Sequence, residues 1–570
     1  MTINAIELIR DHNTQEKYET QSHSSLALIY PYHELRLYIV RLLILLVYSI
    51  VLFGCKPRSS EIQSIYCTND FYDGSYINNN IARGQTFFGE GSLQFMSYYD
   101  NQGRVVIVRR HLDTGQVDKS ILDAGISVSQ NPPASLSNPH NFISGGLDTR
   151  GYIHLIFGAH NSRAQHYVSG TPFNPYGWRE IGEWMDRISH NVTYPYLVKA
   201  PNKDLWLFYR DGRSGYGSTF IVRGLSNSSS SSINPQILID GHKKEINKTT
   251  LRHQHEFPGV RIDPYYENSQ YLFSPVVSPD GCIHLAWTWR LSDFSIDQDN
   301  PWQKKGFQGV TNRDIVYARS CDNGDTWTDS SGRVYHLPLT RLGEREDSHP
   351  EIIDTIDVGS SFYNHYGSAI DSANHVHYIY HNLDDINQTQ IWHLFNNGRS
   401  WIKNKVSAYK KNIPWNRLQV SGLVGTALSR PEILIDLRDN SAIVFTRSDI
   451  YGNRLEIYRS TPPYKNWTRE IVETGSLGGW EPQIDKRLFL EQGQIELLMN
   501  TVRDNNSYQL FDVRLTISQQ NILDSFYKGH AQDYPDYTIL SPVLQFYLDK
   551  DDVRYRENQG CISRLILRKK

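Results

Sequence analysis

The chain has 570 residues, of which 39% are hydrophobic and 12% aromatic, and its formal net charge is -3. This length allows one large core or several smaller ones. A charge so close to zero argues against a chain-wide basic face for nucleic acid, so a polyanionic ligand would have to meet a local basic pocket. The 36 Tyr and 12 Trp residues favour β-strands and flat surfaces on which sugar rings stack.

Residues 35–55 form an apolar stretch with the parts of an export signal. Arg36 and Arg41 precede an apolar run that ends in Leu-Phe-Gly before Cys55. A charged flank, a short apolar core and a small residue before the cut are typical of a secretory signal. The ending resembles a bacterial lipoprotein signal, with Cys55 as the lipidated residue. We expect a leader and signal peptide over 1–54 and an exported lipoprotein, anchored through that lipid at the cell surface or outer membrane. A secreted or periplasmic protein, an uncleaved signal and a single transmembrane anchor are the alternatives.

A strand–turn–strand pattern repeats along the rest of the chain. Three copies, at 143–157, 276–287 and 368–380, place a turn rich in Asp, Asn or Gly between alternating apolar residues. Weaker copies occur at 96–109, 196–209, 433–446 and 482–500. Repeated antiparallel units indicate a β-propeller, in which each four-stranded sheet is one blade.

We therefore predict an all-β chain with a seven-bladed β-propeller over residues 81–520. Residues 55–80 are expected to form a tether, and residues 521–570 to pack on or close the propeller. The segment 320–327 reads S-x-D-x-G-x-T-W, an Asp-box, which is a structural turn on a propeller rim. The insertion 242–268 is expected to fold over the face where propeller ligands bind.

Histidines and cysteines recur without a complete metal site. His154, His284 and His377 occupy one position of the repeat, and we expect them to hydrogen-bond between neighbouring blades rather than to bind metal. With Cys55 lipidated, the four remaining cysteines show no C-x-x-C spacing. They predict neither a disulfide framework nor a zinc site.

Four groups suited to proton transfer flank two consecutive hairpins. His140 precedes and His160 follows the first hairpin, while Tyr194 begins a strand and Arg210 ends its partner. Antiparallel strands place such ends side by side, so all four are expected at one rim of adjacent blades. Removing a proton beside a carboxylate needs a base, an acid and a cation.

This arrangement resembles a known family. The His-Asn pairs around the hairpin, followed by the motif YRDGRSGYG at 209–217, resemble the BNR-type β-propeller proteins that include ulvan lyases of polysaccharide lyase families 24 and 25. The resemblance covers most of residues 80–515. It implies a seven-bladed propeller that cleaves an acidic, sulfated rhamnose–uronate polymer by β-elimination. The catalytic positions that it implies are His140, His160, Tyr194 and Arg210.

The same resemblance shapes our other expectations about the site. Arg213 and Tyr216 depart from the family pattern, which has small or amide side chains there. We expect substrate contacts from Asn141, Asn161, Arg213 and His255. Elimination requires no cofactor, although the family leaves open a structural zinc or calcium ion, for which we assign no ligand. We expect a monomer that does not bind nucleic acid.

The residue types fit the elimination chemistry independently. The planar fork of Arg210 can bind both oxygens of a uronate carboxylate, and His160 can add a hydrogen bond. His140 or Tyr194 then removes the C5 proton, and the other group helps to protonate the leaving O4. A tyrosine, whose ordinary pKa is about 10, needs nearby cations to act as a base. We assign Tyr194 as the acid, and as the base for one uronate epimer, with His140 as the base for the other.

Two other functions remain open from the sequence. A sialidase-like glycoside hydrolase would also carry Asp-boxes, but it needs three arginines around a carboxylate and a Tyr/Glu pair, and the sequence shows no clear arginine triad. A non-catalytic, glycan-binding surface lipoprotein would not require a proton-transfer pair. Taken one by one, Tyr194 could simply pack at a strand start and Arg210-Asp211 could be an ion pair at a turn.

Overall fold

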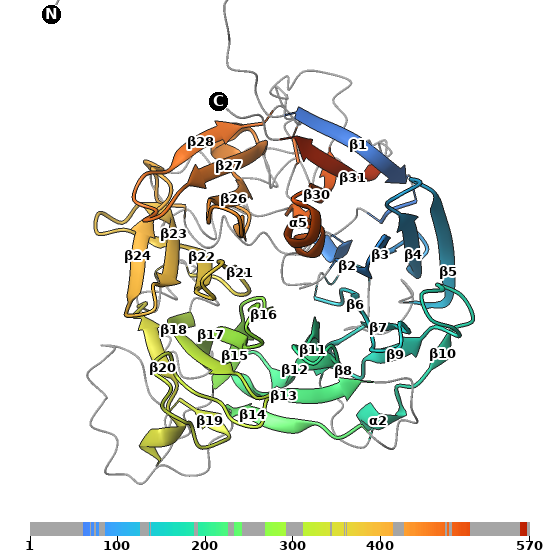
Figure 1. Ribbon diagram of the computed structural model, residues 1–570, viewed down its shortest axis with the longest axis horizontal. Coiled ribbons are helices and arrows are strands. Elements are labelled where there is room, and N and C mark those ends of the chain that lie inside the picture. The colour runs from blue at the N-terminus through green and yellow to red at the C-terminus, as the bar shows by residue number, and fades with distance from the viewer. Residues whose placement is uncertain are drawn as a thin grey trace, which may run out of the picture. The chain divides into compact units, whose positions relative to one another are not determined.

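The computed structural model describes residues 61–68, 70–72, 76–78, 86–125, 136, 138, 140–186, 192–225, 233–241, 268–291, 312–341, 345–357, 360, 362–413, 427–472, 476–477, 481–501 and 559–566. They all belong to one compact unit, Ser59–Leu567. Within it the described strands form seven sheets, which Figure 1 shows following one another around a ring. The prediction of a mainly β chain is confirmed.

Most of the sheets have four strands joined in antiparallel order. The first three sheets are β2 (Phe87–Glu90), β3 (Leu93–Tyr99), β4 (Arg104–His111) and β5 (Val117–Gly125); β6 (Ser144–Leu147), β7 (Ile153–Phe157), β9 (Gln165–Val168) and β10 (Arg179–Glu180); and β8 (His160–Ser162), β11 (Val192–Lys199), β12 (Leu205–Arg213), β13 (Tyr216–Leu225), β14 (Gln236–Asp240) and β19 (Leu339–Thr340). The next three are β15 (Asn268–Leu272), β16 (Val276–Val277), β17 (Ile283–Leu291), β18 (Asn312–Ser320) and β20 (Glu351–Asp354); β21 (Gly367–Ile370), β22 (Val376–Leu383), β23 (Thr389–Asn396) and β24 (Trp401–Lys405); and β25 (Glu432–Ile435), β26 (Ala442–Arg447), β27 (Leu455–Ser460) and β28 (Thr468–Ile471).

The seventh sheet joins the two ends of the described chain. It contains β29 (Gln483–Ile484), β30 (Ile495–Thr501), β31 (Gln559–Ile566) and β1 (Glu61–Thr68). Because β31 pairs with both β30 and β1, strands almost 500 positions apart in the sequence share one sheet. The stretch that we expected to be a tether therefore contains a strand, and β31 lies in the segment expected to pack on or close the propeller.

Short helices complete the described elements: α2 (Glu183–Asp186), α5 (Lys486–Gln492) and 3-10 turns at Tyr76–Asn78, Glu346–Ser348 and Asp449–Tyr451. Six of the seven predicted hairpins are confirmed as antiparallel pairs joined by turns. The seventh was predicted wrongly, since α5 lies between β29 and β30 in place of a tight turn. The Asp485 carboxylate caps this helix by accepting the Leu488 N–H at 2.9 Å, and Gly493 ends it in the left-handed conformation, with φ 69°.

An aspartate begins several of the hairpin turns for a local reason. Asp148 Oδ1 accepts the N–H groups of the residues two and four positions later, Arg150 and Tyr152, at 2.9 and 2.8 Å. Asp371 does the same before β22, at 2.9 and 2.8 Å. The carboxylate thus replaces backbone partners that the turn cannot supply. In the Asp-box, Ser320 Oγ donates to Asp322 and accepts the Gly324 N–H, both at 2.8 Å.

The repeat histidines bond within their own sheets, so the expectation of bonds between blades is wrong. His154 Nδ1 lies 2.9 Å from His166 Nε2 in β9, and His377 Nδ1 lies 2.8 Å from His393 Nε2 in β23. His284 Nδ1 lies 2.7 Å from the Tyr317 hydroxyl in β18. Each partner is on the next strand, because a side chain on one face of a sheet meets its cross-strand neighbour first.

A disulfide joins Cys282 to Cys321, which contradicts the expectation from their spacing. Cys282 precedes β17 and Cys321 follows β18, and the neighbouring residues Ile283 and Ser320 are directly paired. The two cysteines are 39 positions apart in the sequence, because both strands and the segment that connects them lie between the cysteines. Sequence spacing therefore could not reveal that they are adjacent.

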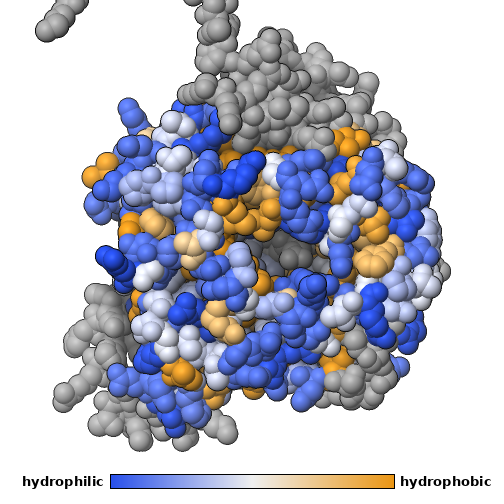
Figure 2. All heavy atoms as spheres, viewed as in Figure 1, coloured by the Kyte–Doolittle hydropathy of each residue, from blue (hydrophilic) through white to orange (hydrophobic). Residues whose placement is uncertain are grey.

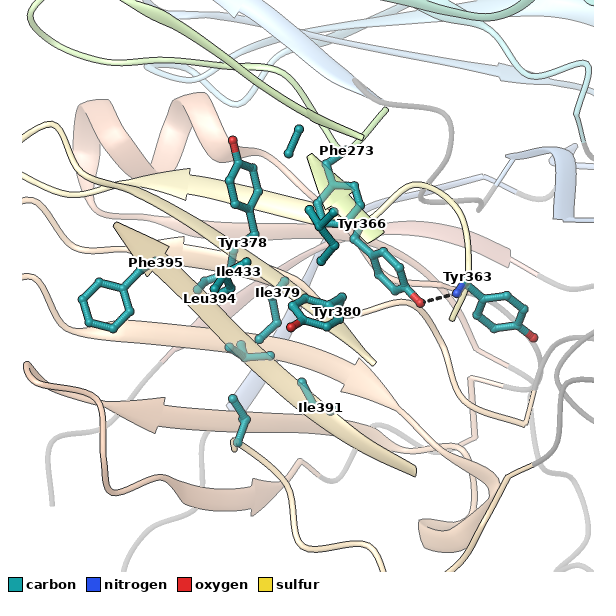
Figure 3. Close-up of a cluster of buried hydrophobic side chains, with 14 of the residues drawn as sticks. Phe273, Tyr363, Tyr366, Tyr378, Ile379, Tyr380, Ile391, Leu394, Phe395 and Ile433 are labelled. Atoms are coloured by element: carbon teal, nitrogen blue, oxygen red, sulfur yellow. Dashed lines mark hydrogen bonds between the residues drawn. The ribbon is translucent and has the colours of Figure 1, made fainter. Parts of the chain in front are cut away.

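Aromatic side chains fill the space between sheets (Figure 3). Phe273, Tyr366 and Tyr378 belong to one buried cluster, together with apolar residues of β21 to β26. The Tyr366 hydroxyl accepts the Tyr363 N–H at 2.7 Å, which fixes the loop before β21. Figure 2 shows a largely hydrophilic face with hydrophobic residues gathered beside a central hollow. Among the described residues, no helix is long and apolar enough to span a bilayer.

Buried histidines should make the fold sensitive to acid. Burial lowers the pKa of His284 from 6.5 to about 4, so the unfolded chain binds more protons than the folded chain between these values. The free energy of unfolding should therefore fall as the pH drops from about 6.5 to about 4, by up to about 3 kcal/mol for this residue. Urea denaturation at pH 7 and pH 4.5 measures the difference in the free energy of unfolding, and His284→Asn should make that difference smaller. An equal pH dependence in wild type and variant would contradict the assignment.

Candidate active site

Two backbone pairings bring distant residues of the site together. After β7 the chain crosses to the next sheet, where β8 pairs with β11 and His160 lies opposite Thr193. Thr193 in turn lies opposite Arg210 of β12. The Asn161 N–H donates to Thr193 Oγ1 at 2.7 Å and reinforces this junction. The end of one hairpin is thereby fixed against the start of the next.

The four predicted catalytic residues meet at this junction. The His140 and His160 rings are stacked, with centroids 4.2 Å apart and planes 15° from parallel. The Tyr194 ring lies 5.9 Å from that of His140, and Arg210 Cζ lies 5.0 Å from the centre of the Tyr194 ring. Two imidazoles, a phenol and a guanidinium thus form one cluster.

The backbone of Tyr194 departs from regular strand geometry. Its φ of 54° is unusual for a residue with a side chain. The pairing of β11 with β12 is also irregular between Thr193 and Tyr196. Such local strain persists only where the surrounding structure holds it, and it is concentrated at functional sites.

Asn138 holds both imidazoles from one side. Its Oδ1 accepts the His140 backbone N–H at 3.1 Å and lies 2.7 Å from His140 Nδ1. Its Nδ2 lies 2.7 Å from His160 Nδ1. One side chain therefore contacts both rings.

Two further residues, not predicted from the sequence, reach the site from neighbouring sheets. The Tyr271 ring of β15 lies 5.5 Å from that of Tyr194, and Arg210 Cζ lies 5.0 Å from its centre. The His365 ring, just before β21, lies 4.2 Å from the Tyr194 ring. Tyr194, Arg210, Tyr196 and His365 line a small pocket with Thr219, Gln270 and Leu272.

The sequence held a signal for one of these two. His365 precedes the hairpin 368–380 much as His140 precedes the hairpin 143–157. Tyr271 follows a long insertion and has no distinguishing motif. Its place in the site follows only from the packing of one sheet against the next.

Burial and arginine charges shift the proton affinities of the cluster. Burial, with His160, Arg210 and Arg430 nearby, holds the pKa of His140 well below 6.5. Burial and Arg210 lower the pKa of His160 to about 4. Both imidazoles are therefore neutral at neutral pH.

The two tyrosines shift in opposite directions. Burial, and then Tyr271, raise the pKa of Tyr194 above 10, against the opposing charges of Arg210, Arg430 and Arg290. Burial also opposes ionisation of Tyr271, but Arg210 and Arg290, with a hydrogen bond from Ser214, outweigh it and lower the pKa of Tyr271. The phenol of Tyr194 thus keeps its proton while that of Tyr271 is the more acidic.

The arginines around the phenols differ in how they are held. Two buried nitrogens of Arg210, Nε and Nη1, have no hydrogen-bond partner among the described residues. Arg430 is paired with Glu481, whose Oε2 accepts from Nη2 at 2.6 Å and whose Oε1 accepts from Nε at 2.9 Å. Arg210 is consequently the arginine best placed to receive an anionic group.

The other predicted contacts fall in different places. Asn141 is fully buried, with 0% of its surface exposed. Asn161 is exposed next to the site, and Arg213 is exposed at the β12–β13 turn with its Cζ 5.6 Å from the Tyr216 ring centre. His255 and Cys55 lie outside the described residues. Within the described part of the chain, no group of three or more His, Cys, Asp and Glu side chains is arranged to hold a metal ion.

Residues 93–409, more than half of the chain, match the BNR repeat-containing family. The chain belongs to this family. An ulvan lyase of Nonlabens ulvanivorans is 25% identical over 181 residues, which cover 29% of this chain and 38% of that protein. The match therefore spans well under half of the relative's length.

Solved structures give a similar picture of the fold. A family PL25 ulvan lyase, determined alone and bound to -[GlcA(1-4)Rha3S]-, aligns with a TM-score of 0.54 at 16% identity. The alignment covers 76% of this chain and 93% of that chain. At this identity the likeness shows a shared fold.

The lowered pKa of Tyr271 can be tested without substrate. On raising the pH, the near-ultraviolet tyrosinate absorption of the wild type should include a component that titrates below pH 10, because the Arg210 and Arg290 charges stabilise the Tyr271 phenolate. Tyr271→Phe should remove this component. The matched control Tyr176→Phe, at a tyrosine with 46% of its surface exposed, should retain it. An unchanged titration in Tyr271→Phe would contradict the assignment.

Proposed function

We propose that this protein is a polysaccharide lyase that cleaves ulvan, a sulfated rhamnose–uronic acid polymer, by β-elimination on a seven-bladed β-propeller. The observation that carries the proposal is the stacked His140–His160 pair beside Tyr194 and Arg210. This cluster holds a neutral base, a protonated acid and a cation within one site. The ulvan lyase relatives support the choice of substrate.

Arg210 begins the reaction by binding the uronate carboxylate. Arg210 is 4% exposed, and its Nε and Nη1, which have no partner among the described residues, can donate to carboxylate oxygens. Neutralising the carboxylate makes the C5 proton more acidic and stabilises the charge that develops when the proton leaves. His160 adds a hydrogen bond to the same group.

Loss of the C5 proton and departure of the O4 leaving group then follow. A base takes the C5 proton, the C5–H electron pair forms the C4=C5 double bond, and the C4–O4 bond breaks. O4 receives a proton from the acid, which leaves a 4,5-unsaturated uronate end. The raised pKa of Tyr194 suits it to the role of acid, and the neutral imidazole of His140 suits it to the role of base.

The proposal also covers the location, the oligomeric state and the cofactor requirement of the protein. We infer that the protein is exported, anchored through a lipid on Cys55, and acts as a monomer on an acidic polysaccharide without a cofactor. The apolar stretch 35–55 and its Cys55 ending support export. The substrate is expected to reach Asn161 and Arg213 at the rim of the site.

One observation favours a second candidate, a sialidase-like hydrolase. Arg210, Arg290 and Arg430 all act electrostatically on Tyr194, an arrangement that the sequence did not reveal. A hydrolase of this kind uses three arginines to hold a carboxylate. The pairing of Arg430 with Glu481 occupies one of the three, which favours the lyase.

Substitutions at the acid and base test the lyase. Tyr194→Phe and His140→Ala should each lower the rate of formation of unsaturated product from ulvan by about 10²-fold or more, since each removes a proton-transfer group. Absorbance of the 4,5-unsaturated product measures the rate, and thermal unfolding checks the fold. The matched control Tyr176→Phe should react at the wild-type rate. Wild-type rates in both site variants, or chain shortening without the absorbance, would overturn the proposal, and the latter would support the hydrolase.

A further inference from the structure

The orientation of the Asn138 amide is fixed by the backbone. The His140 N–H can only donate, and it points to one atom of the amide at 3.1 Å. That atom must therefore be the oxygen, since an NH₂ group cannot accept the bond. The other end of the amide, facing His160, is the NH₂ group.

This orientation dictates where each neutral imidazole carries its proton. Asn138 Oδ1 can only accept, so His140 Nδ1, at 2.7 Å, carries the hydrogen and Nε2 keeps a lone pair. Asn138 Nδ2 can only donate, so His160 Nδ1, at 2.7 Å, keeps its lone pair and Nε2 carries the hydrogen. The two stacked rings are thus held in opposite tautomers.

We propose that Asn138 is a positioning residue that makes His140 Nε2 a proton acceptor and His160 Nε2 a hydrogen-bond donor. The inference deepens the proposed lyase function, on which its kinetic part rests. It selects His140 as the base and leaves His160 to donate to the uronate carboxylate or to the charge that develops on it. A single amide thereby gives two chemically identical side chains different tasks.

The tautomers can be read directly. In wild-type protein labelled with ¹⁵N-histidine, solid-state ¹⁵N NMR at neutral pH should show one of the pair protonated at Nδ1 and the other at Nε2. Spectra of His140→Gln and His160→Gln assign the signals. This measurement needs no substrate, so it stands whether or not the protein is a lyase.

Asn138→Asp provides the sharpest perturbation, because it keeps the shape and the acceptor but removes the donor. The His140 signal should remain, while the His160 proton should move to Nδ1 or the ring should become doubly protonated. On ulvan, kcat and kcat/KM should fall together, on the order of 10²-fold, as expected when an interaction made in the transition state is lost. The control Asn397→Asp, at an exposed turn where the side-chain oxygen alone accepts N–H bonds, should match the wild type.

Each outcome decides a separate point. The same tautomer on both rings of the wild type, or unchanged His160 signals in a folded Asn138→Asp, would overturn the role of Asn138. If instead the tautomers are as expected and wild-type protein forms no unsaturated product, the lyase proposal fails while the positioning role stands. Asn138→Ala, which removes both bonds, serves as the second variant should Asn138→Asp unfold, and it should mix the tautomers of both rings.

Discussion

The site depends on one crossing of the chain from a sheet to its neighbour. Through the pairing of His160 with Thr193, and of Thr193 with Arg210, a residue that follows the hairpin of one sheet lies beside the first strand of the next. Without the short strand β8, the histidines would belong to one sheet and Tyr194 with Arg210 to another. With it, backbone hydrogen bonds fix side chains from both sheets at distances suited to chemistry.

The interior around this junction contains several charged side chains. Three arginines act on Tyr194, and Glu481 pairs with one of them, Arg430. Burial, reinforced by the arginine charges, keeps the imidazoles neutral, and the pKa values of Tyr194 and Tyr271 shift in opposite directions. An anionic ligand would compensate the buried charge of Arg210, because a cation is costly to bury without a nearby anion. These charges agree with the acidic substrate that we propose.

Sequence reasoning succeeded where a structural feature lies close to a local signal. The hairpins were predictable from alternation and turn residues, and the clustering of His140, His160, Tyr194 and Arg210 was predictable from their places at strand ends. Tyr271, His365 and Asn138 could not be recognised as a set. Tyr271 and His365 meet the others only when separate sheets pack together, and Asn138, although it bonds the nearby His140, reaches His160 only through the same packing. Helix α5 and the bond between Cys282 and Cys321 were missed for a related reason. The first replaces a turn without changing the strands around it, and the second joins residues that are neighbours only across a strand pair.

The sheet made of β1, β29, β30 and β31 has a consequence for how the protein is made. On the ribosome, β1 emerges early and must wait for β31, which is synthesised nearly five hundred residues later. The ring of sheets cannot close during most of synthesis, and long-range pairing of this kind is slow.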